Sequence, residues 1–190
     1  KPLSETQLKA LRSSVADFTV ADAQKIKDIE KITNHDVKAV EYFVKDKLDA
    51  AGLSAIKEFV HFGLTSQDIN NTSIPLLTKN ALHEIMFPAL QTIIEKLDSL
   101  VREWKEISIL AFTHGQPASP TKLGKEINVF CYRLQTQLAD AKAIKNAAKF
   151  GGATGNFNAH HVAYPKHDWL KFANEFVSQL GLSRPAYTTQ

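Results

Sequence analysis

The stretch Thr113-His114-Gly115-Gln116-Pro117-Ala118-Ser119-Pro120 separates the two longest helical patterns of this 190-residue sequence. It is polar, and its glycine and two prolines restrict the backbone. On both sides, apolar residues recur at intervals of three and four, the spacing of one helix face. A second polar segment, residues 61–72, lies one long helix earlier. Because a bundle can bring such segments together at helix ends, the sequence predicts helices packed around a polar site.

The helix before the quoted stretch should be long and largely apolar on one face. Pro75 suits its first turn, and Pro88 should kink it. The stripe consists of Leu82, Met86, Ala89, Ile93, Leu97, Leu100 and Trp104.

The helix after the stretch should open with Ser119 as its cap and Pro120 at its first position. We expect it to end at Gly151-Gly152. Its stripe consists of Leu123, Ile127, Phe130, Leu134, Leu138, Ala141 and Ile144.

Shorter helices are expected at both ends of the chain. Ser4 and Gln7 match a capping box, and residues 33–36 interrupt a helix that resumes at Val37. Asp168 should cap a last helix. The side chains of that helix that we expect to face inward are Trp169, Phe172, Phe176 and Leu180. No strand pattern of strict alternation is seen, so the predicted fold class is all-α.

Composition and charge narrow the function classes. Hydrophobic residues make up 44% and charged residues 23%, as in ordinary soluble domains. The formal charge of +3 comes without a basic cluster interleaved with aromatics, which disfavours nucleic-acid binding. No apolar run approaches a membrane span, and no signal peptide appears. Cys131 is the only cysteine and is expected in the core, so no intrachain disulfide can form. We therefore predict a cytoplasmic protein.

The polar segments carry uncharged donors suited to carboxylates and phosphates. These donors are Thr65, Ser66, Gln67, Thr113, Gln116, Asn156 and Asn158. His35, His61, His114 and His160 lie in or beside the polar breaks, where a histidine can donate or accept a proton. His35 could equally be a plain helix cap. His160 and His161 are adjacent and match no zinc spacing, so we expect no metal.

Four motifs together resemble the adenylosuccinate lyase family, and they are closest to the bacterial-type branch of that family. The family belongs to the fumarase/aspartase superfamily. They are His61-x-Gly63-x-Thr65-Ser66-x-Asp68, Thr113-His114-Gly115-Gln116-Pro117-Ala118, Thr33-Asn34-His35-Asp36-Val37 and Asn156-x-Asn158-Ala159-His160. The resemblance covers nearly the whole chain in family order. Other members of the superfamily usually have leucine at the position of Gly115. The fold implied is the superfamily's long-helix bundle, with residues 1–72 as the end of a small helical N-terminal domain and 73–190 as the first part of the bundle.

The resemblance implies a carbon–nitrogen lyase of purine biosynthesis that needs no cofactor. It would eliminate fumarate from adenylosuccinate to give AMP, and from the succinylcarboxamide intermediate SAICAR to give AICAR. His114 would be the general acid. His35 and Asp36 would lie near the nucleotide phosphate, and Thr65 and Ser66 would hold the succinyl carboxylates. Gln67, Asn158 and Gln190 are further substrate-binding candidates, Gln190 from another subunit; His61, Asp68 and Gln116 are candidates for loop support.

The chain also departs from the family pattern. It lacks the Gly-Ser-Ser-x-Met-Pro-x-Lys-x-Asn-Pro loop that carries the general base, and the N-terminal Arg-Tyr segment. The resemblance therefore implies a fragment that is inactive by itself. The family is a homotetramer, so a homo-oligomer is expected. Two alternatives stay open: a non-catalytic helical scaffold, and a superfamily relative acting on another succinyl-type substrate.

Overall fold

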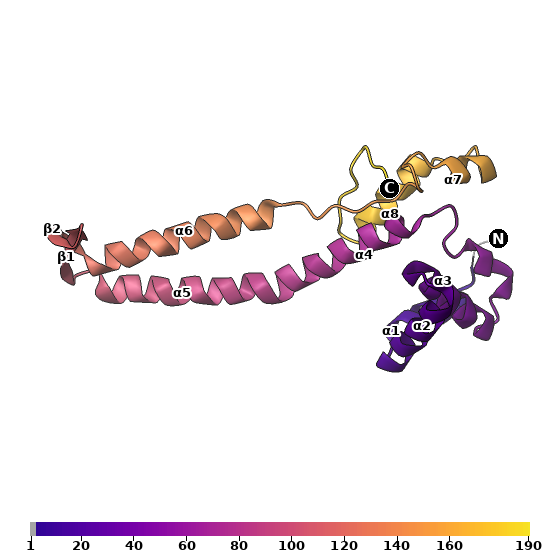
Figure 1. Ribbon diagram of the computed structural model, residues 1–190, viewed down its shortest axis with the longest axis horizontal. Helices are drawn as coiled ribbons and strands as arrows, with labels where there is room; N and C mark the ends of the chain where they lie inside the picture. The colour runs from indigo at the N-terminus through magenta and orange to yellow at the C-terminus, as the bar shows by residue number, and fades with distance from the viewer. Residues whose placement is uncertain (1–2) are drawn as a thin grey trace. The chain divides into compact units, whose positions relative to one another are not determined.

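Helices make up most of the computed structural model, which describes residues 3–190 (Figure 1). The all-α prediction is confirmed as a mostly helical fold, to which the structure adds one β-hairpin. The elements are α1 (Glu5–Ala16), α2 (Val20–Thr33), α3 (Asp36–Ala50), the 3-10 helix η1 (Ser54–Phe59), α4 (Ser66–Ala81), the π-helix η2 (Leu82–Met86), α5 (Phe87–Trp104), β1 (Ser108–Thr113), β2 (Gln116–Lys122), α6 (Leu123–Ala143), α7 (Asn158–Ala163) and α8 (Trp169–Gln179).

The chain divides into two compact units. The first combines the chain up to Ile74 with Ala147–Gln190, and the second is Pro75–Asn146. The first unit therefore joins segments far apart in the sequence, because the end of the chain packs with its beginning. The division into domains 1–72 and 73–190 stays a prediction.

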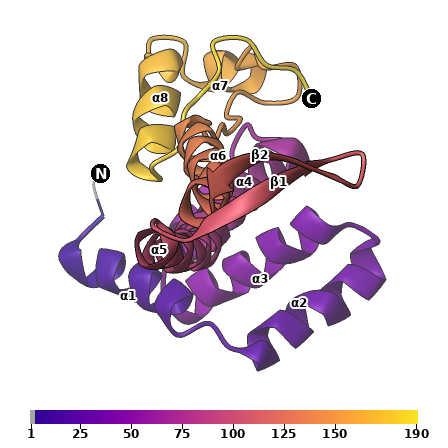
Figure 2. The ribbon, with the colours of Figure 1, turned by 90° about the vertical axis from the view of Figure 1, so that its left-hand side faces the viewer.

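In the first unit, α2 and α3 lie side by side (Figure 2). Thr19 and Asp22 form a reciprocal capping box at the start of α2. Lys47 Nζ of α3 donates to Asp22 Oδ1 at 3.1 Å, and the Phe18 and Phe43 rings meet edge to face at 5.9 Å. These contacts hold α3, which His35 caps at its N-terminus. The predicted capping box of Ser4 and Gln7 is confirmed on α1.

In the second unit, α5 packs against α6 (Figure 1). The buried face of α5 differs from the predicted stripe by one residue, because Ile94 is buried whereas Ile93 is half exposed. The buried core is Phe87, Ile94, Cys131 and Leu138. Cys131 is 1% exposed, so its prediction as a core residue is confirmed. A Cβ at Gly124 would lie 2.6 Å from the Val101 carbonyl oxygen, so the two helices approach this closely only because residue 124 is glycine.

The prediction that Ser119 and Pro120 start a helix is wrong. Both lie in β2, which pairs antiparallel with β1, and α6 begins only at Leu123. His114 and Gly115 have φ of 51° and 76° and form the turn between the strands. Two consecutive positive φ values match the twist of a two-residue hairpin turn, and this turn chemistry outweighs the helix-start signal.

The boundaries of the long helices also differ from the prediction. Pro75 lies inside α4, because that helix already begins at Ser66, and η2 directly precedes Phe87-Pro88. Helix α4, η2 and α5 follow one another without a break, and the π turn, in which the Phe87 N–H donates to the Leu82 carbonyl, accommodates Pro88 inside this run.

The end of α6 and the exposure of two rings on α8 are further corrections. Helix α6 ends at Ala143 rather than Gly151, since the backbone of residues 148–149 bonds to Ser183 and Asn71 instead. Asp168 caps α8 as predicted, but Phe172 and Phe176 are 41% and 39% exposed.

Candidate functional site

The start of α4 gathers the hydroxyls of the first polar segment. Thr65 directly precedes the helix, Ser66 begins it, and both side chains are partly exposed, as is that of Gln67. The first backbone N–H groups of a helix have no partner within it, and the helix dipole is positive there. This end of α4 therefore combines two hydroxyl donors with a backbone that favours an anion.

Asp68 is a buried part of the scaffold rather than an exposed ligand. Its carboxylate accepts from the backbone N–H groups of Thr65 at 2.8 Å, Gly151 at 2.9 Å and Gly152 at 3.0 Å, and from Lys149 Nζ at 2.8 Å. It thereby ties residues 151–155, the glycine-rich segment, to the start of α4. This geometry agrees with the loop-support role suggested for Asp68, which remains a proposal.

The end of the chain reaches the same place. Thr65 Oγ1 donates to Gln190 Oε1 at 3.4 Å within one chain, whereas the resemblance implied a glutamine from another subunit. The preceding residues pack directly on the glycine-rich segment, because a Cβ at Gly155 would lie 2.2 Å from the Thr188 carbonyl oxygen. Asn158 is exposed at the start of α7. The structure thus places Gln190 at the hydroxyl group of Thr65. Among the described residues, it shows no contact of Asn158 with that hydroxyl group.

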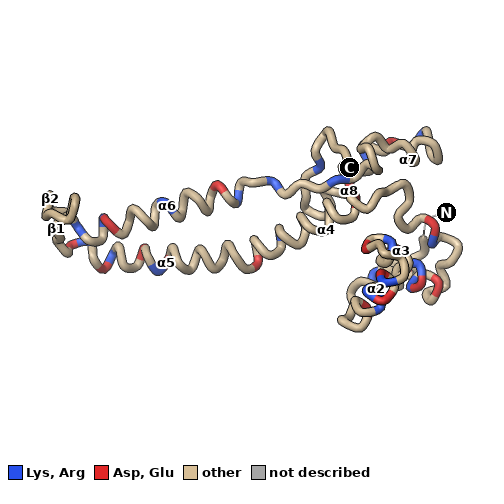
Figure 3. Tube along the Cα trace, viewed as in Figure 1, with Lys and Arg blue, Asp and Glu red and all other residues tan. Residues whose placement is uncertain are grey.

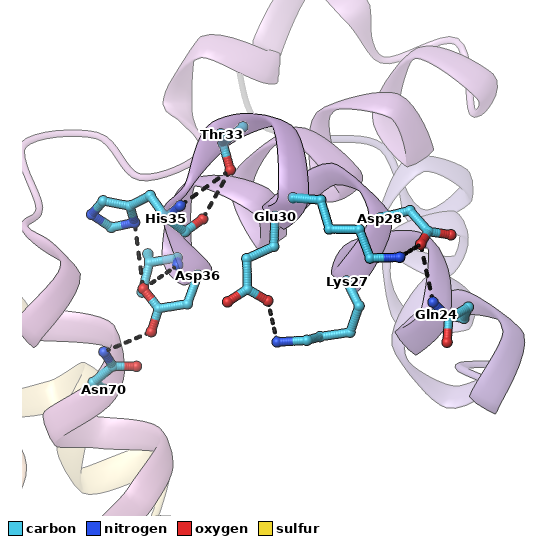
Figure 4. A network of polar contacts seen from close by, with 10 residues as sticks. Gln24, Lys27, Asp28, Glu30, Thr33, His35, Asp36 and Asn70 are labelled. Carbon is cyan, nitrogen blue, oxygen red and sulfur yellow. Dashed lines mark hydrogen bonds and ion pairs between the residues drawn. The ribbon is translucent and has the colours of Figure 1, made fainter.

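His35 is the N-cap of α3 (Figure 4). Its Nδ1 accepts from the Lys38 backbone N–H at 3.2 Å, which matches the plain capping interpretation and leaves Nε2 to carry the proton of the neutral ring. Asp36 Oδ2 accepts from Asn70 Nδ2 of α4 at 3.4 Å. The Val37 backbone N–H is the main cause that holds the pKa of Asp36 below its usual range. The group is half-exposed and can meet a ligand from solvent.

His61 and His160 differ in their surroundings near the loop before α4. His61 is partly exposed in a positive-φ conformation, and burial lowers the pKa of its ring. His160 is 1% exposed and lies 4.7 Å from the Trp169 ring centroid. A Cβ at Gly63 would come within 2.6 Å of the His160 ring, so this histidine packs directly beneath the loop. It also lines an aromatic hollow of about 510 Å³ beside α8.

Replacing His160 by phenylalanine should weaken the loss of stability in mild acid. Burial lowers the pKa of His160, and neither ring nitrogen has a hydrogen-bond partner within the described chain. The unfolded chain therefore takes up this proton first, and the free energy of unfolding should decline as pH falls below about 6.5.

Urea titrations at about pH 7.5 and about pH 5.5 measure this effect. The wild-type chain should lose more stability between them than His160→Phe, with His161→Phe on the exposed side of α7 as the control. Equal losses in all three chains would show that His160 is not the responsible group.

His114 and Gln116 belong to the other unit, on the hairpin. His114 is exposed in the turn, and Gln116 begins β2 opposite Thr113. A histidine at the tip of a two-residue hairpin turn is open to solvent on most sides.

The residue types and the distribution of charge in the described chain bear on the other function classes. Residues 3–190 contain no group of three or more histidine, cysteine, aspartate or glutamate side chains that could hold a metal ion. Within the same residues, every helix is too short or too polar to cross a membrane. Figure 3 shows basic and acidic residues interspersed along α2 and α3.

Lys149 is a residue of this region that sequence reasoning missed. Its only sequence signal is its place two residues before Gly151-Gly152, and that position does not reveal a partner 81 residues away.

The sequence matches the model of the family described as "Lyase" over residues 3–190. It is 49% identical over 200 residues to adenylosuccinate lyase of Dictyostelium discoideum, covering 100% of this chain and 43% of that protein. It is 47% identical over 191 residues to adenylosuccinate lyase of Haemophilus influenzae, covering 100% of this chain and 42% of the relative. The chain thus spans about two fifths of the length of these curated relatives.

Solved structures show the same fold at low identity. A fumarate lyase from Mesorhizobium sp. BNC1 superposes with a TM-score of 0.78 at 20% identity, covering 98% of this chain and 42% of that one. A β-carboxy-cis,cis-muconate cycloisomerase from Acinetobacter calcoaceticus superposes with a TM-score of 0.71 at 23% identity, with the same coverage of both chains.

Proposed function

The chain belongs to the lyase family and is a homologue of adenylosuccinate lyases, and from this premise we propose that it serves the elimination of fumarate from adenylosuccinate. AMP would be the other product. The same elimination from SAICAR would give AICAR. The observation that carries the proposal is the pair of hydroxyls at the start of α4, Thr65 and Ser66, in a sequence 45–49% identical to adenylosuccinate lyases.

The hydroxyls of Thr65 and Ser66 would hold the carboxylates of the succinyl group. Removal of a proton from the carbon beside a carboxylate shifts negative charge onto that carboxylate, which becomes an aci-carboxylate. Hydroxyl donors and the positive end of α4 stabilise this charge more strongly than that of the substrate, which lowers the barrier. Gln67, on the same turn, and Gln190, next to Thr65, would bind the remaining polar groups.

His114 would protonate the departing nitrogen. Breaking the carbon–nitrogen bond leaves an electron pair on the purine amine, and a general acid supplies the proton that makes this amine a stable leaving group. Its exposed place in the turn leaves the ring accessible to a ligand. Gln116, which opens the paired strand, would support that turn. We propose none of the described residues as the base that removes the carbon-bound proton.

His35 and Asp36 would lie at the nucleotide end of the substrate. The exposed edge of the His35 ring presents Nε2, a donor suited to a phosphate oxygen. Asp36, fixed by the Val37 backbone N–H and by Asn70, would orient the ring or accept from the ribose. Asn158 is kept as a weaker candidate for substrate binding.

We also propose a homo-oligomer, as in the family's tetramer, for which sedimentation velocity is the direct measurement. The second unit exposes apolar side chains on η2, α5 and α6 that a partner copy would cover. They include Ile85, Met86, Ile93 and Phe130, each at least half exposed. A cytoplasmic location remains a prediction.

Substrate choice tests the proposal in the complete protein that carries this sequence. Fumarate release should be seen with adenylosuccinate and with SAICAR, followed by ultraviolet absorbance, and not with argininosuccinate or aspartate. Release from argininosuccinate or aspartate alone would favour another superfamily activity. No release from any of them would favour the non-catalytic scaffold.

A further inference from the structure

Lys149 and Asp68 form an ion pair withdrawn from water. Their Nζ and Oδ1 atoms lie 2.8 Å apart, and the two side chains are 5% and 0% exposed. Ions lose their hydration when buried, so such a pair persists only where further hydrogen bonds replace the lost water. Here each carboxylate oxygen has two donors: Lys149 and Gly151 for Oδ1, Thr65 and Gly152 for Oδ2.

Lys149 has further contacts with the glycine-rich segment and with α4. Its ammonium also donates to the Gly152 carbonyl at 2.6 Å. Its backbone N–H donates to the Asn71 carbonyl at 3.2 Å, and its carbonyl accepts from Thr72 Oγ1 at 3.0 Å. One residue therefore fastens the glycine-rich segment to the first turns of α4.

From these contacts we infer that Lys149 is a positioning residue, which acts through the carboxylate of Asp68 to fix Thr65 and Ser66 for the reaction. The inference rests on the function proposed above. Asp68 Oδ2 holds the backbone N–H of Thr65, so the orientation of that carboxylate sets the residue that precedes α4. Without the ammonium, a buried carboxylate loses its counter-charge and must rotate, protonate or admit water. Each of these changes moves the two hydroxyls.

The first test compares Lys149→Met with Lys45→Met in the complete protein. Methionine keeps the length of lysine but removes its charge and its three donors. We expect kcat for adenylosuccinate to fall about 100-fold in Lys149→Met, the size of effect that a misplacement of about 1 Å causes. Lys45 is a matched control, since its ammonium also bridges carboxylates, those of Glu41 at 3.1 Å and Glu58 at 2.9 Å. Lys45→Met should retain the wild-type kcat.

The double variant Asp68→Asn/Lys149→Met separates positioning from stability. Removing both charges should bring the thermal midpoint back toward that of the wild-type protein, because no unpaired charge stays buried. It should leave kcat low, since the NH₂ of an amide cannot accept from the three backbone N–H groups that remain around residue 68. If the double variant regained both stability and kcat, the pair would serve stability alone, and the inference would be wrong.

Hydrogen exchange gives a readout that needs no substrate. The Thr65 and Gly151 amides donate to Asp68, so their exchange should speed up in Lys149→Met and not in Lys45→Met. Unchanged protection of the Thr65 amide would overturn the inference. If the wild-type protein released no fumarate at all, the proposed function would fail, and exchange would still decide whether Lys149 holds Thr65.

Discussion

Replacing His114 by asparagine in the complete protein should lower kcat for adenylosuccinate cleavage by about 10²–10⁴-fold, the usual contribution of a general acid. The amide has no proton to give at neutral pH. Asparagine is chosen because residue 114 has φ of 51°, a conformation that asparagine tolerates better than alanine does. The hairpin should therefore persist, so that the loss reports the missing acid rather than a rearranged turn.

The control for this substitution is His161→Asn, on the exposed side of α7. It removes a histidine without touching the hairpin and should retain the wild-type kcat. Single-turnover rates measured by ultraviolet absorbance separate the chemical step from product release. A kcat for His114→Asn within about threefold of the wild-type value would refute the role as general acid, since that lies far below the expected range.

Replacing Ser66 by alanine should lower kcat by about 10²–10³-fold, the cost of removing one donor to a developing oxyanion. The loss should appear in kcat more than in KM, because the bond would strengthen as charge moves onto the carboxylate. Stability should hardly change, since the Ser66 hydroxyl has no hydrogen-bond partner among residues 3–190 and alanine favours a helix.

Ser73→Ala is the matched control for Ser66→Ala, two turns further along α4. It has the same chemistry and lies in the same helix, away from the helix start. A similar loss of kcat in both variants would point to a general effect on α4. A rise in KM with unchanged kcat in Ser66→Ala would mean that the hydroxyl only binds the substrate.

The mostly helical fold could be predicted because apolar residues recur at helical spacing over long stretches. A wrong assignment at one residue does not change that pattern. The exact interface of α5 with α6 does not follow from those stripes, because Ile93 is half exposed and Ile94 is buried. The hairpin could not be predicted from alternation, since β2 contains two prolines and no apolar-polar period. What closes it is the turn at His114-Gly115, whose positive φ values lie outside any hydrophobic pattern.

The candidate site shows the same division between local and distant information. The cap at His35 is a local signal, readable from a polar break before a helix. The pairing of Asp68 with Lys149 joins positions 81 residues apart, and the contact of Thr65 with Gln190 joins positions 125 apart. No propensity or period carries such pairings, which arise only when the end of the chain packs on its beginning.

A crystal structure of the complete His114→Asn protein with adenylosuccinate tests the central claim most directly. The slow variant should retain the substrate long enough to be seen. We predict a succinyl carboxylate within hydrogen-bond distance of the Thr65 and Ser66 hydroxyls, with the phosphate near His35. Adenylosuccinate bound with its succinyl group away from the start of α4, for example in the aromatic hollow beside α8, would contradict the account.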